Sequence, residues 1–295
     1  SLAWRASEES FLKEVSSINN LKIRGIYGEA GTHGHIGGNN DYSSFASGAG
    51  TSYYGINGSL NSIQQGFYNN QLGNQKTTWE TDKITNVGFD ATIFKNFDLT
   101  FEWYKKKISG LLFQDAGASN LVGGANLPQI NIGDVQNTGV DIAAAYHAKV
   151  GKDFTFSIGT NITAYKSLIT SIPGSGYFDF GYSRDNDIVR NEIGHPIGAF
   201  FGYQTMGLYQ SDVDAGKGAT YAGAKAGSFI YKDVNGDGKI DANDRTWIGN
   251  PNPKFTYGVN LNAAYKRFDF AMVLYGSYGN KDFNYVRYWT DFYST

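Results

Sequence analysis

The chain lacks cysteine entirely, has only 5 prolines in 295 residues, and contains no long apolar run. Without cysteine it can form no disulfide scaffold and use no thiol nucleophile. No stretch approaches the roughly 18 consecutive apolar residues of a transmembrane helix, and the opening SLAWRASEESF does not have the pattern of a signal peptide. The net charge of −2 and the lack of a basic stripe exclude a typical nucleic-acid-binding surface.

Glycine and aromatic residues are abundant instead. The sequence has 38 Gly, 21 Tyr and 20 Phe, whereas charged residues make up 18%. Aromatic residues favour strands and glycine favours turns, so this composition indicates a β-rich protein with long turn-forming loops.

Apolar and polar residues alternate with a period of two in three hairpin-like units. The units cover residues 86–103, 140–163 and 255–278, and their turns are expected at Lys95, Gly151 and Lys266. A further strand is expected at residues 21–28. In the last unit one face carries the apolar residues Phe268, Phe270, Met272, Leu274 and Tyr278.

The hairpins are asymmetric, because short turns at one end face very long connections at the other. The long connections are expected at residues 31–80, 108–136 and 166–254. Short turns, long opposite loops and aromatic residues near the turns are typical of an outer-membrane barrel. The fold predicted is therefore all-β, an antiparallel transmembrane β-barrel portion with long extracellular loops. A soluble β-sandwich or propeller also has alternating strands and is the other possible fold.

The segment 233–244 has the spacing of a calcium-binding loop. Asp233, Asn235 and Asp237 occupy loop positions 1, 3 and 5, Gly238 occupies position 6, and Lys239 at position 7 would offer its backbone carbonyl. Asp241 and Asp244, at positions 9 and 12, complete the set. Calcium takes six to eight oxygen ligands, which alternate residues of a tight loop can supply. The aspartate at position 12 departs from the usual glutamate.

The calcium prediction has an alternative, in which the short polar side chains only cap their own backbone as a solvated Asx-turn loop. The spacing favours a structural calcium ion that fixes the long 166–254 loop.

Several sequence blocks together resemble one family. They include NNLKIRGIYGEAG, TTWETDKITNVGFD, GHPIGAFFGY, DVNGDGKID and IGNPNPKFTYGVN. In this order they are similar to the C-terminal part of SusC/RagA-type TonB-dependent transporters, over nearly the whole chain. The pair DVNGDGKID and IGNPNPKFTYG carries the most specific likeness.

The resemblance implies part of a barrel of about 22 strands around an N-terminal plug in the outer membrane of a Gram-negative, Bacteroidetes-like bacterium. It implies TonB-dependent import of oligosaccharides or peptides, with a SusD-like surface lipoprotein as partner and TonB–ExbB–ExbD acting through an N-terminal part. Residues 1–295 are thus expected to be a partial barrel domain without plug or final strands, in contact with outer-membrane lipid.

Two other functions are considered. A soluble or surface calcium-stabilised carbohydrate-binding β protein would explain the loop and the aromatic residues. A hydrolase would need a carboxylate pair from a group in the last long loop, namely Asp179, Asp185, Asp187 and Glu192. Because no nucleophile, base and orienting group occur together, no catalytic residue is predicted and the chain is not expected to be an enzyme.

Overall fold

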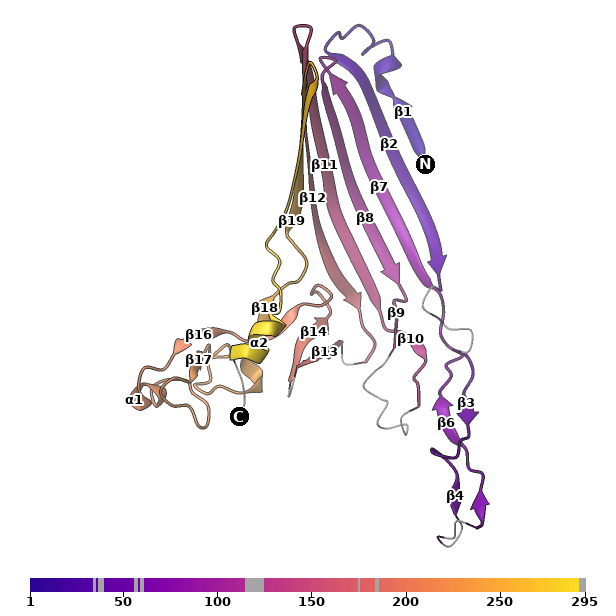
Figure 1. Ribbon diagram of the computed structural model, residues 1–295, viewed down its shortest axis with the longest axis vertical. Coiled ribbons are helices and arrows are strands. Elements are labelled where there is room, and N and C mark those ends of the chain that lie inside the picture. Colours follow the sequence, from indigo (N-terminus) through magenta and orange to yellow (C-terminus); the bar gives the residue numbers. More distant parts are fainter. Residues whose placement is uncertain are drawn as a thin grey trace.

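The structure, a computed structural model, describes residues 1–33, 36, 40–55, 58, 61–114, 125–174, 176–183 and 186–291. Its main element is an eight-stranded antiparallel sheet in which each strand pairs with the next along the chain (Figure 1). The strands, in sheet order, are β1 (Leu2–Arg5), β2 (Ile18–Thr32), β7 (Glu80–Ile93), β8 (Phe97–Ser109), β11 (Asp134–Val150), β12 (Phe154–Ser171), β19 (Phe255–Tyr265) and β20 (Phe268–Tyr278).

Short turns close the hairpins at one end of this sheet. They lie between β7 and β8, β11 and β12, and β19 and β20, where the sequence predicted them. Lys95, Gly151 and Lys266 have φ values of 66°, 66° and 54°, so each turn uses the left-handed region that reverses the chain within few residues. The expected strand at residues 21–28 is also present, as the central part of the longer β2.

The long connections lie at the opposite end of the sheet and form small sheets of their own (Figure 1). β12 continues past residue 166, where the last loop was expected to begin, and the rest of that connection contains a four-stranded sheet. The remaining strands are β3 (Ser44–Ala46), β4 (Tyr54–Gly55), β5 (Ile63–Gln64), β6 (Tyr68–Gln71), β9 (Leu112–Gln114), β10 (Gln129–Asn131), β13 (Tyr177–Ser183), β14 (Asn186–Glu192), β15 (Phe200–Tyr203), β16 (Thr205–Leu208), β17 (Phe229–Tyr231) and β18 (Arg245–Gly249).

Helical segments are few and short. They are η1 (Ala6–Glu8), α1 (Asp212–Ala215), η4 (Ala242–Asp244) and α2 (Tyr285–Asp291). Among the helices of the described residues, none has the length and apolar character needed to cross a membrane.

The register of the large sheet sorts its side chains onto two faces. Directly paired residues lie on the same face, and pairs such as Val87 with Trp103, Ile142 with Ile162 and Val259 with Leu274 are apolar. The alternate pairs are polar, such as Asp90 with Thr100 and Ser157 with Asn262. The predicted alternation is therefore correct across the hairpins, and one face is apolar and the other polar.

The buried apolar residues concentrate where the long connections meet the strand ends, and they include Leu112, Val135, Ile169, Val189 and Ala199. Phe113 of β9 contacts Phe178 of β13 there, with ring centroids 5.9 Å apart. These contacts join two connections that are distant in the sequence, so the loop end is the packed part of the chain.

Candidate functional site

The polar face carries an ion-pair network in the middle of the sheet. Arg24 of β2 pairs with Asp90 of β7, with 3.2 Å between Nε and Oδ2, and with Glu102 of β8. The Thr100 hydroxyl donates to Asp90 (3.1 Å), and the Asn86 amide donates to Glu102 (3.0 Å). Three adjacent strands thus contribute to one charged cluster, which fixes their mutual register.

Nearer the short turns, the same face carries Asp98, which accepts from Thr92 (2.8 Å) and lies 3.2 Å from Nε2 of His147. Toward the loop end, Lys106 pairs with Asp82 at 2.7 Å. A face lined with ion pairs and amides along its length suits contact with water or polar solutes.

The apolar face is exposed in this chain. Phe268 is 79% exposed, and Phe270 and Leu274 on the same strand face are 57% and 49% exposed. A contiguous apolar surface of this kind marks contact with a membrane or another protein.

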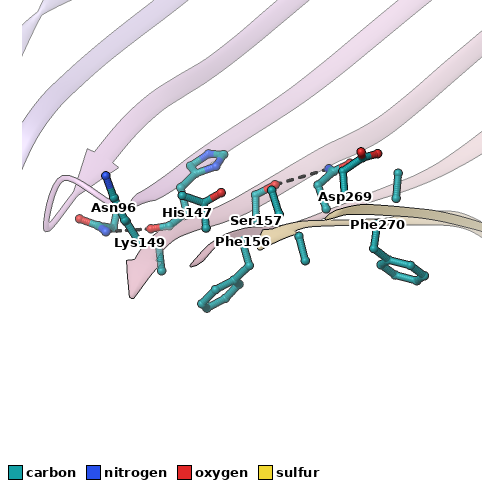
Figure 2. A pocket seen from close by; sticks show the side chains of 13 residues that line it. Asn96, His147, Lys149, Phe156, Ser157, Asp269 and Phe270 are labelled. Atoms are coloured by element: carbon teal, nitrogen blue, oxygen red, sulfur yellow. Dashed lines mark hydrogen bonds between the residues drawn. The ribbon is translucent and has the colours of Figure 1, made fainter. Parts of the chain in front are cut away.

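A hollow of about 560 Å³ lies at the short-turn end of β11, β12, β19 and β20. Figure 2 shows Phe156 and Phe270 on one side of the strands, whereas His147, Ser157 and Asp269 lie on the other. Asn96 donates its amide to the His147 carbonyl at 2.7 Å and so ties one turn to the next hairpin. Because its lining belongs to two opposite faces, this hollow does not bring polar groups together around one ligand.

The connection between β12 and β19 is organised around Arg190. The Arg190 guanidinium forms a two-point ion pair with Asp179, at 2.7 and 2.9 Å, and lies 4.2 Å from the ring centre of Tyr177 and 3.9 Å from that of Phe201. The hydrogen bond to Asp179 raises the pKa of Arg190 above its ordinary value. Arg190 of β14 thus links β13, which carries Tyr177 and Asp179, to β15, which carries Phe201.

The predicted calcium loop follows β17 and ends in η4. Asp233 accepts from the backbone N–H groups of Gly236 (2.6 Å) and Gly238 (2.9 Å). Asn235 accepts from the Asp237 N–H at 3.0 Å, and Asp237 accepts from the Lys239 N–H at 2.9 Å. The side chains therefore cap their own backbone, as the Asx-turn alternative expects.

Asp244 closes this loop. Its side chain is fully buried, and its two oxygens accept from the N–H groups of Asp241 and Val234, both at 2.8 Å. These backbone hydrogen bonds, that of Asp241 first, hold the pKa of the Asp244 carboxyl below its ordinary value. Asp241 in return accepts from the Asn243 N–H, and the side chains of Asp241 and Asp244 together form a capping box at η4. The buried carboxylate thus joins the two ends of the loop.

Within the described residues, no group of three or more His, Cys, Asp or Glu side chains is arranged to hold a metal ion. Each oxygen that accepts one N–H keeps a free lone pair, and the Lys239 carbonyl adds a backbone oxygen to the predicted set. Calcium binding by Asp233, Asn235, Asp237, Lys239, Asp241 and Asp244 therefore stays a prediction.

Among the described residues, the carboxylates considered for hydrolysis do not form a catalytic pair. Asp179 is committed to Arg190. Asp187 and Glu192 lie at opposite ends of β14, and Asp185 lies outside the described residues.

Neither Arg24 nor Arg190 was identified as an important residue from the sequence. For the cluster of Arg24, Asp90 and Glu102, the only sign in the sequence was the alternation of polar and apolar residues around Asp90 and Glu102.

Comparison with curated proteins finds TonB-dependent receptors. The chain is 30% identical over 301 residues to TonB-dependent receptor P3 of Formosa agariphila, covering 97% of this chain and 28% of the receptor. It is 28% identical over 299 residues to TonB-dependent receptor SusC of Bacteroides thetaiotaomicron, covering 95% of this chain and 27% of SusC. The chain thus spans less than a third of the length of these relatives.

Comparison with solved structures finds the same fold. The structure of the RagAB peptide transporter matches with a TM-score of 0.77 at 19% identity, covering 98% of this chain and 30% of the matched chain. The RagAB peptide importer in its closed-closed state matches with a TM-score of 0.72 at 20% identity, covering 94% of this chain and 28% of the matched chain.

No protein-family model matches the chain. The relatives are receptors and transporters rather than enzymes, in agreement with the expectation of no catalytic site. The chain belongs to the SusC/RagA-type TonB-dependent transporters and corresponds to the C-terminal part of their barrel.

Proposed function

We propose that the protein to which these residues belong imports nutrients, oligosaccharides or peptides, across the outer membrane in a TonB-dependent manner. The observation that carries this proposal is the two-faced meander, apolar on one face and charged on the other, with the long connections β2–β7, β8–β11 and β12–β19 all at one end. Such a sheet suits a barrel wall between lipid and a polar lumen. The relationship to SusC and the RagAB fold supports the same activity.

The proposed partners follow from the relatives. A SusD-like surface lipoprotein would sit over the loop end, where the four-stranded sheet of β13, β14, β15 and β18 lies. TonB with ExbB and ExbD would supply energy through a plug. In this orientation the short turns at Lys95, Gly151 and Lys266 face the periplasm.

The soluble carbohydrate-binding alternative is less well supported. It would leave Phe268 and its apolar neighbours exposed to water, whereas lipid contact removes that cost.

Calcium is a separate proposal within this function. The ion would pin the loop at residues 233–244 on the cell surface, where weak affinity is sufficient. The oxygen spacing in the sequence supports it.

The import proposal is tested by deleting the gene for the full-length protein in its native bacterium and growing the strain on a panel of glycans and peptides. We expect loss of growth on one nutrient class and recovery when the gene is restored. The parent strain is first shown to contain the protein in its outer membrane. If the deletion strain then grows normally on every nutrient, the import function is contradicted. Purifying the tagged full-length protein from those membranes tests the lipoprotein partner.

A further inference from the structure

The apolar face changes abruptly to lysine near the loop end. Its last apolar row consists of Trp103, Val140 and Ala164, which are directly paired on β8, β11 and β12. The next row on the same face begins two residues further along each strand. There Thr138 pairs with Lys105 on one side and with Lys166 on the other.

These lysines differ from the two that lie farther toward the loops. Lys83 pairs with Glu29 and Lys107 pairs with Asp134, both at 3.3 Å. Among the described residues, no acidic side chain pairs with Lys105 or Lys166, and both are exposed. The row closest to the apolar surface therefore carries uncompensated positive charge.

A hollow of about 310 Å³ lies at this boundary. Its lining includes Trp103, Val140 and Ala164 from the apolar row, together with Thr138, Lys166 and Lys254. Lys254 is exposed and has no ion pair among the described residues either. The lining therefore combines an apolar floor, an indole, a hydroxyl and ammonium groups, and contains no carboxylate.

We infer that this hollow binds the phosphorylated headgroup of a lipid in the outer leaflet of the membrane. The inference rests on the proposed outer-membrane orientation, in which the loop end faces outward. Ammonium groups attract phosphate, and the Thr138 hydroxyl can donate to it. The acyl chains of the same molecule would cover the Trp103 row.

Two features favour a lipid over a soluble anion. The lysines border the apolar face instead of lining the polar face, where a transported solute would pass. The indole of Trp103 lies at the boundary itself, the position that tryptophan favours at a membrane surface. A free anion would need the lysines but not the apolar row.

The expected strength follows from charge. A lysine near an anionic lipid surface contributes about 1 kcal/mol, which corresponds to about fivefold in affinity. Neutralising Lys105, Lys166 and Lys254 together should therefore weaken binding on the order of 100-fold at low salt.

The test uses the full-length protein in phosphatidylcholine nanodiscs and titrates it with diphosphorylated lipid A, with dephosphorylated lipid A and with inorganic phosphate. The variant combines Lys105→Gln, Lys166→Gln and Lys254→Gln. A matched control removes the same charge at the short turns by Lys95→Gln, Lys152→Gln and Lys266→Gln.

We expect diphosphorylated lipid A to bind the wild type and the control variant equally and the first variant about 100-fold more weakly. Equal binding to all three proteins, equal binding of the dephosphorylated lipid, or equally tight binding of inorganic phosphate would overturn the inference. If the triple variant does not fold, the single variant Lys166→Gln should weaken lipid A binding about fivefold. Unchanged binding by that single variant would overturn the inferred headgroup site. Nutrient uptake is measured in parallel, because loss of uptake with intact lipid A binding bears on the import function alone.

Discussion

Arg24 offers the sharpest test of how the sheet is held together. Its guanidinium bridges Asp90 and Glu102 on two neighbouring strands, and the three side chains are 19%, 34% and 23% exposed. Replacing Arg24 by Met keeps much of the volume but leaves two carboxylates close together without a cation. We expect this change to destabilise the folded protein.

The magnitude follows from burial. Breaking a fully buried ion pair costs about 3–5 kcal/mol, whereas an exposed pair contributes about 0–1 kcal/mol. Because these groups are largely but incompletely shielded, we expect Arg24→Met to lower the free energy of unfolding by about 2 kcal/mol. The triple change Arg24→Met, Asp90→Asn and Glu102→Gln removes the charge imbalance and should recover most of the loss.

The assay is urea unfolding of the full-length protein in detergent micelles, followed by tryptophan fluorescence. Lys83→Met is the matched control, since its ion pair with Glu29 is about half exposed and should matter little. If Arg24→Met unfolds at the same urea concentration as the wild type, or if the triple variant is less stable than the single one, the network does not hold the register.

Three further predictions concern the loop and the sheet. Replacing Asp233 and Asp237 by Ala should abolish any protection of residues 233–245 from protease by calcium, and a wild-type loop cleaved equally with calcium and with chelator would remove the calcium proposal. The lowered pKa of Asp244 means that its carboxylate stabilises the loop fully above its ordinary value of 3.8, and that this contribution is lost as pH falls through the lower folded value. Hydrogen exchange of this loop, corrected for its intrinsic pH dependence, should therefore accelerate only below pH 3.8, and faster exchange already near neutral pH would contradict the assignment. Gly139→Ala should cost about 1–3 kcal/mol in urea unfolding, because the added Cβ would lie 2.6 Å from the Tyr104 hydroxyl oxygen, and adding Tyr104→Ala should relieve part of that cost.

Much of the large sheet could be predicted from the sequence because its determinants are local. Alternation assigns the faces of β19 and β20, and short turns at Lys95, Gly151 and Lys266 fix the hairpin registers. The strand β1 was not predicted, since four residues at one edge show no clear period.

The loop end could not be predicted to the same depth, because its pairings are not local. β15 pairs with β14 through Val189 and Phe200 and with β18 through Phe200 and Gly249, so the sheet depends on contacts between residues far apart in the sequence. Two of its strands, β15 and β18, have only four and five residues, which gives little alternation to read. The ion pair of Arg24 with Glu102 could not be predicted for the same reason. It forms only when both the β2–β7 register and the β7–β8 register are set.

The four-stranded loop sheet also bears on the order of folding. β19 and β20 are separated by two residues, whereas β12 and β19 are separated by residues 172–254, and closing the longer connection costs about 3 kcal/mol more in chain entropy. β13 follows soon after β12, and β18 directly precedes β19, so pairing within the loop sheet brings the two ends of that connection together. Folding of the surface loop therefore lowers the entropic barrier to joining two hairpins in the wall, and a loop variant that prevents its sheet from forming would slow the pairing of β12 with β19.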